Sequence, residues 1–348
     1  MRIYTQVWRA LMAPYAQSNW LDAPWLVTEF YFYRRVAQAF GYFKTGYDCF
    51  HAQKRLGLEG ALSLTQQLTA RGEEVYAAAA AATDPAAGRA TALRFAVFAS
   101  LWGNKMDLSL WPSQTNDANK AQAFASVLEA SSANLLADAF PAVAQHLGTA
   151  AGDKDQGKRV DIVVDNAGFE LITDLILADC LIRTGLAAKV VLHTKGHPTF
   201  VSDAMDKDVR ETVAFLAANG VGCAAHWARY LEDGRWELHA HTYWAQPFPF
   251  WEMPPDVRAD LGRADLAFVK GDANYRRLLG DRTWDLSTPF TDVAGYFPCP
   301  VAPLRTLKAE LGCGMPAAQV ARARAADPKD WMVTGKYGVV QFLDPAAL

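Results

Sequence analysis

Several short motifs that identify common enzyme classes are missing from this sequence. It contains no GxxxxGK[ST] phosphate-binding loop, no GxGxxG after a predicted strand and no GxSxG. No Ser-His-Asp or Cys-His arrangement stands out either. These absences exclude the usual P-loop, dinucleotide-binding and nucleophile-elbow enzymes, so any chemistry must come from another set of residues.

Cysteine is scarce as well. The chain has 348 residues and five scattered cysteines with no CxxC pair: Cys49, Cys180, Cys223, Cys299 and Cys313. An odd number without metal-ligand spacing predicts free thiols in a reducing compartment, not a disulfide framework or a zinc site.

No excess of positive charge is present. With 34 basic and 37 acidic residues the formal net charge is −3, whereas non-specific nucleic-acid binding needs a broad field of Lys and Arg. We therefore expect no nucleic-acid partner. A local basic pocket for a small anion stays open, because the total charge hides its distribution.

Long apolar runs are absent too. The first 20 residues lack a continuous apolar segment, so we expect no signal peptide. No stretch of 18 apolar residues occurs, so we expect no membrane span and a cytoplasmic protein.

The first part of the chain reads as helical. Apolar residues recur at helical spacing or good helix formers dominate over residues 26–40, 59–82, 92–102 and 117–147. The polar, glycine-containing segment 151–159 is the best boundary. We therefore predict a helical domain over residues 1–150 and a second domain over 151–348.

The second part has a different texture. Two short β-branched runs, 160–164 and 188–193, alternate with helical patterns over 169–184 and 204–218, and Gly185 provides a helix stop. This alternation is typical of βαβ units. Further strands are predicted at 236–241, 264–270 and 338–342. The expected fold is a three-layer α/β/α domain with a mostly parallel sheet, preceded by the helical domain.

Asp165 and Asn166 follow directly after the first predicted buried strand. Ligands bind at this edge of open α/β sheets. A carboxylate and an amide oxygen suit magnesium or manganese better than zinc. Gly168 allows a tight turn into the next helix, whose start favours an anion. The same two residues also suit a simple helix cap.

The loop after the second strand lies on the same edge if the sheet is parallel. Its sequence, HTKGHPTFVSDAMDKD, offers Asp203, Asp206 and Asp208 as further oxygen ligands, and composition alone does not choose between them. From composition alone, a solvated acidic helix start explains them better. Isolated histidines such as His193 and His197 are more often structural.

Basic residues follow in three further segments. The stretch FVKGDANYRRLLGDR (268–282) places Arg276 and Arg277 after a strand and a turn, where arginine can bind phosphate. In RTLKAE (305–310), one helical face would present both Arg305 and Lys308. Lys336 lies in the glycine-flanked TGKYG. Ordinary turns and solvated faces remain the alternatives.

Together these motifs resemble one family, the damage-control phosphatases. The closest resemblance is to its third subfamily, sugar-phosphate phosphatases also described as acidic-residue (protein-glutamate) methyltransferases. The matching segments occur in the same order: PWLVTEFYFYRR (24–35), SLWGNKMDLS (100–109), VDNAGFELITDLILAD (164–179), FVSD (200–203), KGDANYRRLLGDR (270–282), RTLK (305–308), which fits an RTxK signature, and TGKYG (334–338).

The resemblance implies a role for particular residues. The metal ligands would be Asp165, Asn166 and Asp203, and the RTxK lysine is Lys308. Asp165 and Asn166 would also contact substrate, together with the stretch Asp272, Ala273, Asn274, Tyr275 and Arg276. The family usually has Leu where this chain has Ala273. In the methyltransferase description, Glu170 and Asp203 would contact S-adenosylmethionine.

The expected activity is metal-dependent hydrolysis of small phosphomonoesters such as fructose 1-phosphate or fructose 6-phosphate. The divalent metal would be Mn²⁺ or Ni²⁺, or else Co²⁺ or Mg²⁺. Arg276 and Lys308 would neutralise the phosphate, and Asp203 or Glu170 would accept the proton of water. From the first domain we expect Glu29, Arg34, Asn104 and Asp107 to contribute.

Two other functions remain open. One is an S-adenosylmethionine-dependent carboxyl methyltransferase, although the chain lacks the glycine-rich loop of the usual methyltransferase fold. The other is a non-catalytic sugar-phosphate-binding protein, which would be free to lose the metal ligands. The expected partner is a small phosphorylated metabolite, and the sequence leaves the oligomeric state open.

Overall fold

A seven-stranded sheet forms the centre of the molecule. The computed structural model describes residues 2–103, 131–149 and 157–348. The strands are ordered β1-β7-β6-β5-β2-β3-β4, and every neighbouring pair is parallel except β6 with β7. Their bounds are β1 Leu135–Asp138, β2 Arg159–Val163, β3 Lys189–Lys195, β4 Trp236–His241, β5 Leu266–Lys270, β6 Val301–Thr306 and β7 Gly338–Val340.

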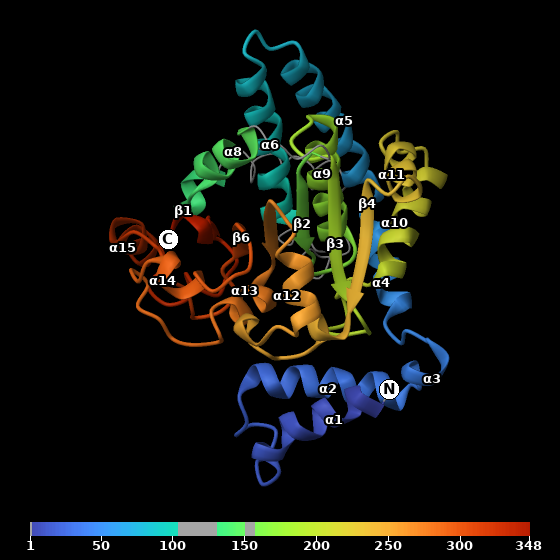
Figure 1. The fold of residues 1–348 in the computed structure, drawn as a ribbon, viewed down its shortest axis with the longest axis vertical. Helices are drawn as coiled ribbons and strands as arrows, with labels where there is room; N and C mark the ends of the chain where they lie inside the picture. Colours follow the sequence, from blue (N-terminus) through green and yellow to red (C-terminus); the bar gives the residue numbers. More distant parts are fainter. Residues whose placement is uncertain (1, 104–130, 150–156) are drawn as a thin grey trace.

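Helices cover both faces of this sheet (Figure 1). One face packs against α5 Leu62–Ala80, α6 Pro85–Trp102, α8 Phe140–Gly148, α9 Phe169–Arg183, α10 Asp206–Ala218 and α11 Ala224–Glu232. The other packs against α12 Pro255–Leu261, α13 Asp272–Leu278, α14 Phe290–Ala294 and α15 Ala317–Ala326. The expected three-layer α/β/α fold with a mostly parallel sheet is confirmed.

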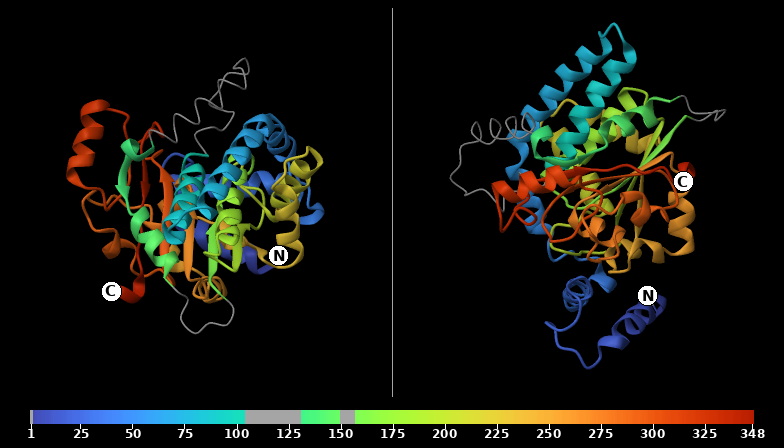
Figure 2. Two further views of the ribbon diagram at one scale, coloured as in Figure 1. Left: turned by 90° about the horizontal axis from the view of Figure 1, so that it is seen from above. Right: turned by 90° about the vertical axis from the view of Figure 1, so that its left-hand side faces the viewer.

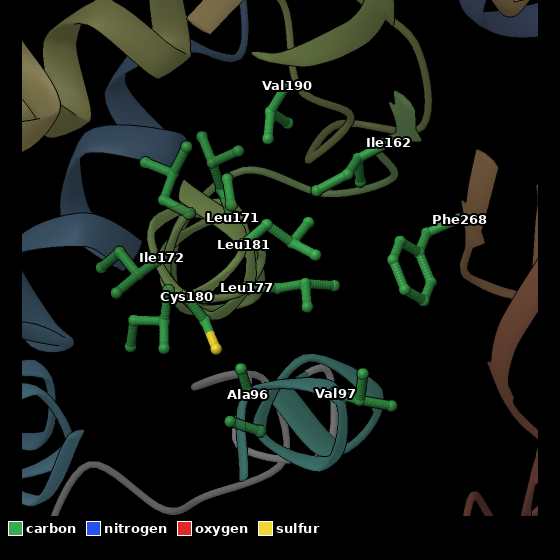
Figure 3. Close-up of a cluster of buried hydrophobic side chains, with 14 of the residues drawn as sticks. Ala96, Val97, Ile162, Leu171, Ile172, Leu177, Cys180, Leu181, Val190 and Phe268 are labelled. Atoms are coloured by element: carbon green, nitrogen blue, oxygen red, sulfur yellow. The ribbon is translucent and has the colours of Figure 1, made fainter. Parts of the chain in front are cut away.

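The central strands are apolar on both faces because both are covered. In β5, Leu266 and Phe268 enter the core beneath α6 and α9, whereas Ala267 and Val269 enter the core of the opposite face. Figure 3 shows Phe268 and Ile162 of the sheet facing α9, which packs in turn on α6. Helix α9 is therefore held between the sheet and a second helical layer.

Two glycines define the ends of α9. Gly168 precedes it with φ 70° and Gly185 follows it with φ 70°, a backbone region that other residues rarely adopt. The predicted turn and the predicted helix stop are both confirmed. Asp165 and Asn166 therefore lie in a short connection that begins at the end of β2 and finishes at Gly168.

The first helices lie across one edge of the sheet. These are α1 Arg2–Met12, α2 Trp25–Ala39, α3 Tyr42–Thr45 and α4 His51–Gly60. In Figure 1 and in the side view of Figure 2, α1 and α2 lie beyond the ends at which β3 and β4 finish. They therefore face the edge on which Asp165 was expected.

Two strands were missed by the sequence interpretation. Residues 117–147 were expected to be helical, but residues 135–138 form β1, and 117–130 lie outside the described residues. Strand β6 was also missed. The proposed boundary lies largely outside the described residues, and the division at residue 150 stays a prediction. Helices α5 and α6 share one hydrophobic core with the sheet.

Among the described residues, no helix combines the length and the apolar character that crossing a membrane requires.

Candidate active site

A cavity of about 880 Å³ opens where β2 and β5 end. The chain passes from β2 to its neighbour β3 on one side, and from β5 to β6 on the other. Connections that diverge in this way leave a crevice at the carboxyl ends of the strands, where open α/β sheets bind ligands. Residues after β2 and β5 line this cavity, as do Thr306 at the end of β6 and Lys308 just beyond it.

Asp165 lies two residues beyond β2 and presses against the backbone after β5. A Cβ atom placed on Gly271 would lie 1.9 Å from Asp165 Oδ2. Gly271 also has φ 82°, so both the space and the backbone conformation require glycine. This close approach joins the two connections that form the floor of the cavity.

Asp203 lies beside Asp165, as the sequence predicted. Residues 166 and 203 form an antiparallel bridge, and the Ala204 amide donates to the Asp165 carbonyl at 2.8 Å. Lys195 Nζ, at the end of β3, lies 3.0 Å from Asp203 Oδ2 and 3.8 Å from Asp165 Oδ1. The sequence interpretation overlooked this lysine, although its place at the strand end was a usable signal.

Asn166 and Glu170 complete the acidic side of the cavity. Asn166 Nδ2 donates to Asp165 Oδ2 at 3.1 Å and to Glu170 Oε2 at 2.8 Å, while its Oδ1 accepts from Ser202 Oγ at 2.7 Å. Glu170 projects from the first turn of α9. Thus the expected residues Asp165, Asn166, Glu170 and Asp203 all line one cavity.

Lys270 is a second buried cation in this group. Its Nζ lies 2.9 Å from Asp174 Oδ1 and 3.7 Å from Glu170 Oε1, and it donates to the Ser100 carbonyl at 2.5 Å. Burial lowers the pKa of Lys270, but the charges of Asp174 and Glu170 outweigh burial and raise it. Lys270 is therefore a fixed positive charge inside the cavity wall.

The acidic group carries more negative charge than its surroundings balance. Burial and the charge of Asp203 raise the pKa of Asp165 well above its usual value. Burial also raises the pKa of Asp203, with Lys195 opposing it. Asp165 Oδ1 is buried and has no hydrogen-bond partner among the described residues. A bound cation would relieve this repulsion, so the carboxylates fit a divalent metal.

Cationic side chains also line the cavity. Arg276, Arg282 and Lys308 border the cavity. The Arg276 guanidinium lies 4.3 Å above the Trp25 ring, and its Nε donates to Asp281 Oδ1 at 2.8 Å. This contact brings α2 into the site through a residue, Trp25, that the sequence interpretation did not single out.

Some predicted substrate residues do not face the cavity. Asn274 is fully buried and donates to the carbonyls of Val164 and Lys270, and buried Tyr275 donates to Gln341. Asp272 and Ala273, from the same stretch, do line the cavity. The first residues of α13, Asp272 and Ala273, thus face the cavity, and the next two, Asn274 and Tyr275, face the core.

The helical interpretation of residues 305–310 is wrong. Arg305 is the fifth residue of β6 and is fully buried, donating to Asp272 Oδ1 and to the carbonyls of Ala309 and Leu311. Lys308 follows the strand and is exposed at the cavity. Arg305 therefore organises the backbone around the site, and only Lys308 faces the substrate space.

The candidates from the first part of the chain are not found at the cavity among the described residues. Arg34 is buried and stacks on Phe43 at 4.8 Å, and neither it nor Glu29 is among the residues that line the cavity. Asn104 and Asp107 lie outside the described residues. Asp206 and Asp208 do not border the cavity either.

A separate His-Asp group lies on strands β3 and β4 and the neighbouring helix α12. His193 of β3, His239 of β4 and Asp260 of α12 place possible ligand atoms within 4.8 Å of one another. These atoms are already hydrogen-bonded: His193 Nε2 to Asp161 at 2.7 Å and His239 Nδ1 to Asp260 at 2.6 Å. Arg159 bridges Asp161 and Asp260.

The fold and the cavity together define an α/β enzyme-like site that combines buried carboxylates with cationic side chains. The comparisons with known proteins place it further. The chain belongs to the family of the damage-control phosphatase ARMT1-like domain, whose model matches residues 4–323. It is therefore a member of a phosphatase family, as the resemblance implied.

Relatives extend over most of the chain. Damage-control phosphatase ARMT1 of Danio rerio is 35% identical, with 94% of this chain and 75% of that protein covered. Its Homo sapiens counterpart is 34% identical, with 94% and 76% covered. The crystal structure of a DUF89 family protein from Pyrococcus horikoshii is 14% identical, with a TM-score of 0.49 and 90% and 87% coverage.

Family membership and the groups of possible ligands indicate a divalent metal ion for this protein.

Proposed function

We propose that this chain is a divalent-metal-dependent phosphatase that hydrolyses small phosphomonoesters in the cavity beside Asp165. The observation that carries the proposal is the incomplete pairing of the buried Asp165 carboxylate, whose Oδ1 accepts no hydrogen bond from the described residues. A buried carboxylate in this state gains from a bound cation. The family gives independent support for phosphatase chemistry.

The proposed metal ligands are Asp165, Asn166 and Asp203. Three oxygen donors suit Mn²⁺ and Mg²⁺, and Ni²⁺ or Co²⁺ also accepts such a set. Asn166 now presents Nδ2 to Asp165 and Oδ1 to Ser202. A half-turn of the amide would present its oxygen instead, and the Ser202 hydroxyl can then accept where it now donates.

The His-Asp group is the less suitable place for the ion. Its carboxylate, Asp260, already pairs with Arg159 and accepts from Arg263, and its His193 is hydrogen-bonded to Asp161. It is also not among the residues that line the cavity. A metal there would have to displace these existing bonds, whereas at Asp165 it would meet a carboxylate oxygen that accepts no hydrogen bond from the described residues, with Lys195 as the neighbouring cation.

The chain's own residues would supply the rest of the reaction. A divalent ion supplies charge neutralisation of the phosphate and a lowered pKa of water. Arg276 and Lys308, which also line the cavity, would neutralise phosphoryl oxygens. Asp203 or Glu170 would accept the proton of the attacking water, since both line the cavity.

The proposed substrates are small phosphorylated metabolites, with fructose 1-phosphate and fructose 6-phosphate as the first to test. A cavity of about 880 Å³ lies in the range of roughly 300–1,000 Å³ usual for small-molecule sites. Its acidic and amide groups also offer hydrogen bonds to sugar hydroxyls.

The test is phosphate release from a panel of phosphomonoesters. The protein is stripped with a chelator and then assayed alone and with Mn²⁺, Ni²⁺, Co²⁺ or Mg²⁺. We expect activity only with metal. Asp165→Asn, which keeps the size of the side chain, should lower kcat/KM by about a thousandfold or more, because it removes a charged ligand.

A matched variant separates the two candidate metal groups. His239→Gln alters the His-Asp group and should keep metal-dependent activity. Full activity of the chelated protein, or of Asp165→Asn, would show the proposal to be wrong. Loss of metal dependence in His239→Gln alone would move the metal to the other group.

A further inference from the structure

The loop that carries Asp203 has a strained backbone. We call residues 199–204 the Asp203 loop. Phe200 has φ 48° and Val201 has φ 64°, in the left-handed region. A β-branched residue such as Val201 is crowded there, so the surrounding structure must hold the conformation. The question is which parts of the molecule do so.

Helix α2 holds the loop from one side through the Phe200 ring. Its centroid lies 4.7 Å from that of Phe30, edge to face, 5.3 Å from that of Tyr33, and 6.3 Å from that of Trp25. We call these three α2 side chains the aromatic socket. Edge-to-face and offset contacts of this kind fix the direction of a ring. The socket therefore fixes the start of the Asp203 loop.

Helix α4 holds the other end through Lys54. Its Nζ donates to the Asp203 carbonyl at 2.7 Å and to Asp208 Oδ2 at 2.7 Å, and it lies 3.4 Å from Asp48 Oδ2. Lys54 is buried. An ammonium group has three donors, and here two carboxylates balance its charge while the third acceptor is the backbone of the metal-ligand residue.

The connection after β2 contacts the loop on its other side. The Ala167 amide donates to the Ser202 carbonyl at 2.6 Å, and the Ala204 amide donates to the Asp165 carbonyl at 2.8 Å. The loop is thus placed between the connection after β2 and the first helices. Neither of these contacts, however, reaches the carbonyl of Asp203, which Lys54 holds.

We propose that Lys54 is a positioning residue that sets the direction of Asp203 relative to Asp165. Through this contact, helix α4 would help to orient one of the proposed metal ligands. This inference rests on the proposed function, because it treats Asp203 as a metal ligand. Lys54 itself would touch neither metal nor substrate.

The chain offers a matched control for Lys54. Lys207 Nζ lies 3.1 Å from Asp48 Oδ2 and 2.9 Å from Asp208 Oδ1, so it pairs with the same two carboxylates. Its contacts among the described residues do not include Asp203. Lys54→Met and Lys207→Met therefore remove the same kind of charge pair, and only the first removes the contact with the loop.

The first measurement is Mn²⁺ affinity by calorimetry. Loss of a group that orients a metal ligand typically weakens binding about 10- to 100-fold, and we expect this for Lys54→Met. Lys54→Arg, which keeps a donor to the carbonyl, should restore most of the affinity. Lys207→Met should bind like the unaltered protein. Equal affinity in Lys54→Met and Lys207→Met would overturn the proposal.

The second measurement needs no metal. Hydrogen exchange of the Asp203 and Ala204 amides in the metal-free protein should become at least about tenfold faster in Lys54→Met than in Lys207→Met, since local opening sets this rate. Phe200→Leu, which empties part of the aromatic socket, should also accelerate it. Unchanged exchange in Lys54→Met would overturn the positioning role. Faster exchange in a protein that binds no Mn²⁺ at all would support that role and reject the proposed metal site.

Discussion

Two groups of acids lie in or near the central strands β2 and β3 but differ in how they are balanced. Asp161, inside β2, accepts two hydrogen bonds from Arg159 and one from His193. Asp165, two residues beyond the strand, accepts a hydrogen bond from Asn166, and its ion pair among the described residues is a long one, with Lys195 Nζ at 3.8 Å. Four positions along the chain thus separate a satisfied carboxylate from an unsatisfied one.

The pKa shifts follow the same division. Burial raises the pKa of Asp260. Hydrogen bonds from Arg263, His239 and Arg159 outweigh burial and hold this pKa far below its usual value. At the cavity, burial and like charges raise the pKa of Asp165. The first group stabilises the folded chain as it stands. The second stores unfavourable energy that a ligand can relieve, which is typical of a functional site.

The largest effect should come from removing the satisfied acid. Asp161→Ala leaves buried His193 without its hydrogen-bond partner and removes one of the two carboxylates that pair with Arg159, and breaking such a pair costs about 3 kcal/mol or more. Asp165→Ala should change the free energy of unfolding by less than about 1 kcal/mol or raise it, because it removes repulsion. Urea denaturation without metal measures both. Similar losses in the two variants would remove the distinction between the groups.

The next effect is on the pH dependence of stability. Burial raises the pKa of Asp174 from 3.8 to about 6, although Lys270 opposes it. A raised acid pKa gives stability that is full below about pH 4 and lost as the pH rises through 6. The loss approaches about 3 kcal/mol for two pKa units. Asp174→Asn should flatten this part of the profile.

Asp260→Asn should act with the opposite sign. The lowered pKa of Asp260 gives stability that is present above the unfolded-state pKa near 4 and lost as the pH falls. Its replacement should therefore flatten the acidic side of the profile. If both variants flatten the same side, the two groups are not electrostatically different.

A backbone change can disturb the unsatisfied group without touching a charge. Gly271→Ala would place a methyl group 1.9 Å from Asp165 Oδ2. We expect kcat/KM to fall about 100-fold, since displacements near 1 Å have this effect. Gly185→Ala is the control, because φ there is also positive, at 70°, but nothing lies within 4 Å. Equal activity in the two variants would contradict the close packing.

The smallest effect should come from the rim of the cavity. Trp25→Ala removes the ring below the Arg276 guanidinium. A partly exposed cation–π contact contributes about 0.5–1 kcal/mol, so KM should rise about two- to fivefold, with a smaller loss of kcat because Trp25 is also the most distant ring of the aromatic socket, 6.3 Å from Phe200. Trp20 is also exposed but stacks on Tyr31. Trp20→Ala should leave KM as it was, and steady-state kinetics of both variants decides.

The sequence alone determined much of the sheet and one side of the site. Short apolar runs and glycine positions are local signals, so β2, α9 and the turn holding Asp165 and Asn166 were predicted correctly. The order of the motifs also gave the family, which the comparisons confirm. Strand β6 was missed because it contains Pro303, which argues against an inner strand, and β1 because it has only four residues.

Only the tertiary structure decided how the charges are shared. No spacing in the sequence connects Lys54 with Asp203, 149 positions later, or shows that Arg305 is buried against Asp272 while Lys308 faces the cavity. The physical reason is that strand and helix periodicity depend on neighbours along the chain. Whether a buried carboxylate is satisfied depends on cations that folding brings from distant segments. That difference separates Asp161 from Asp165.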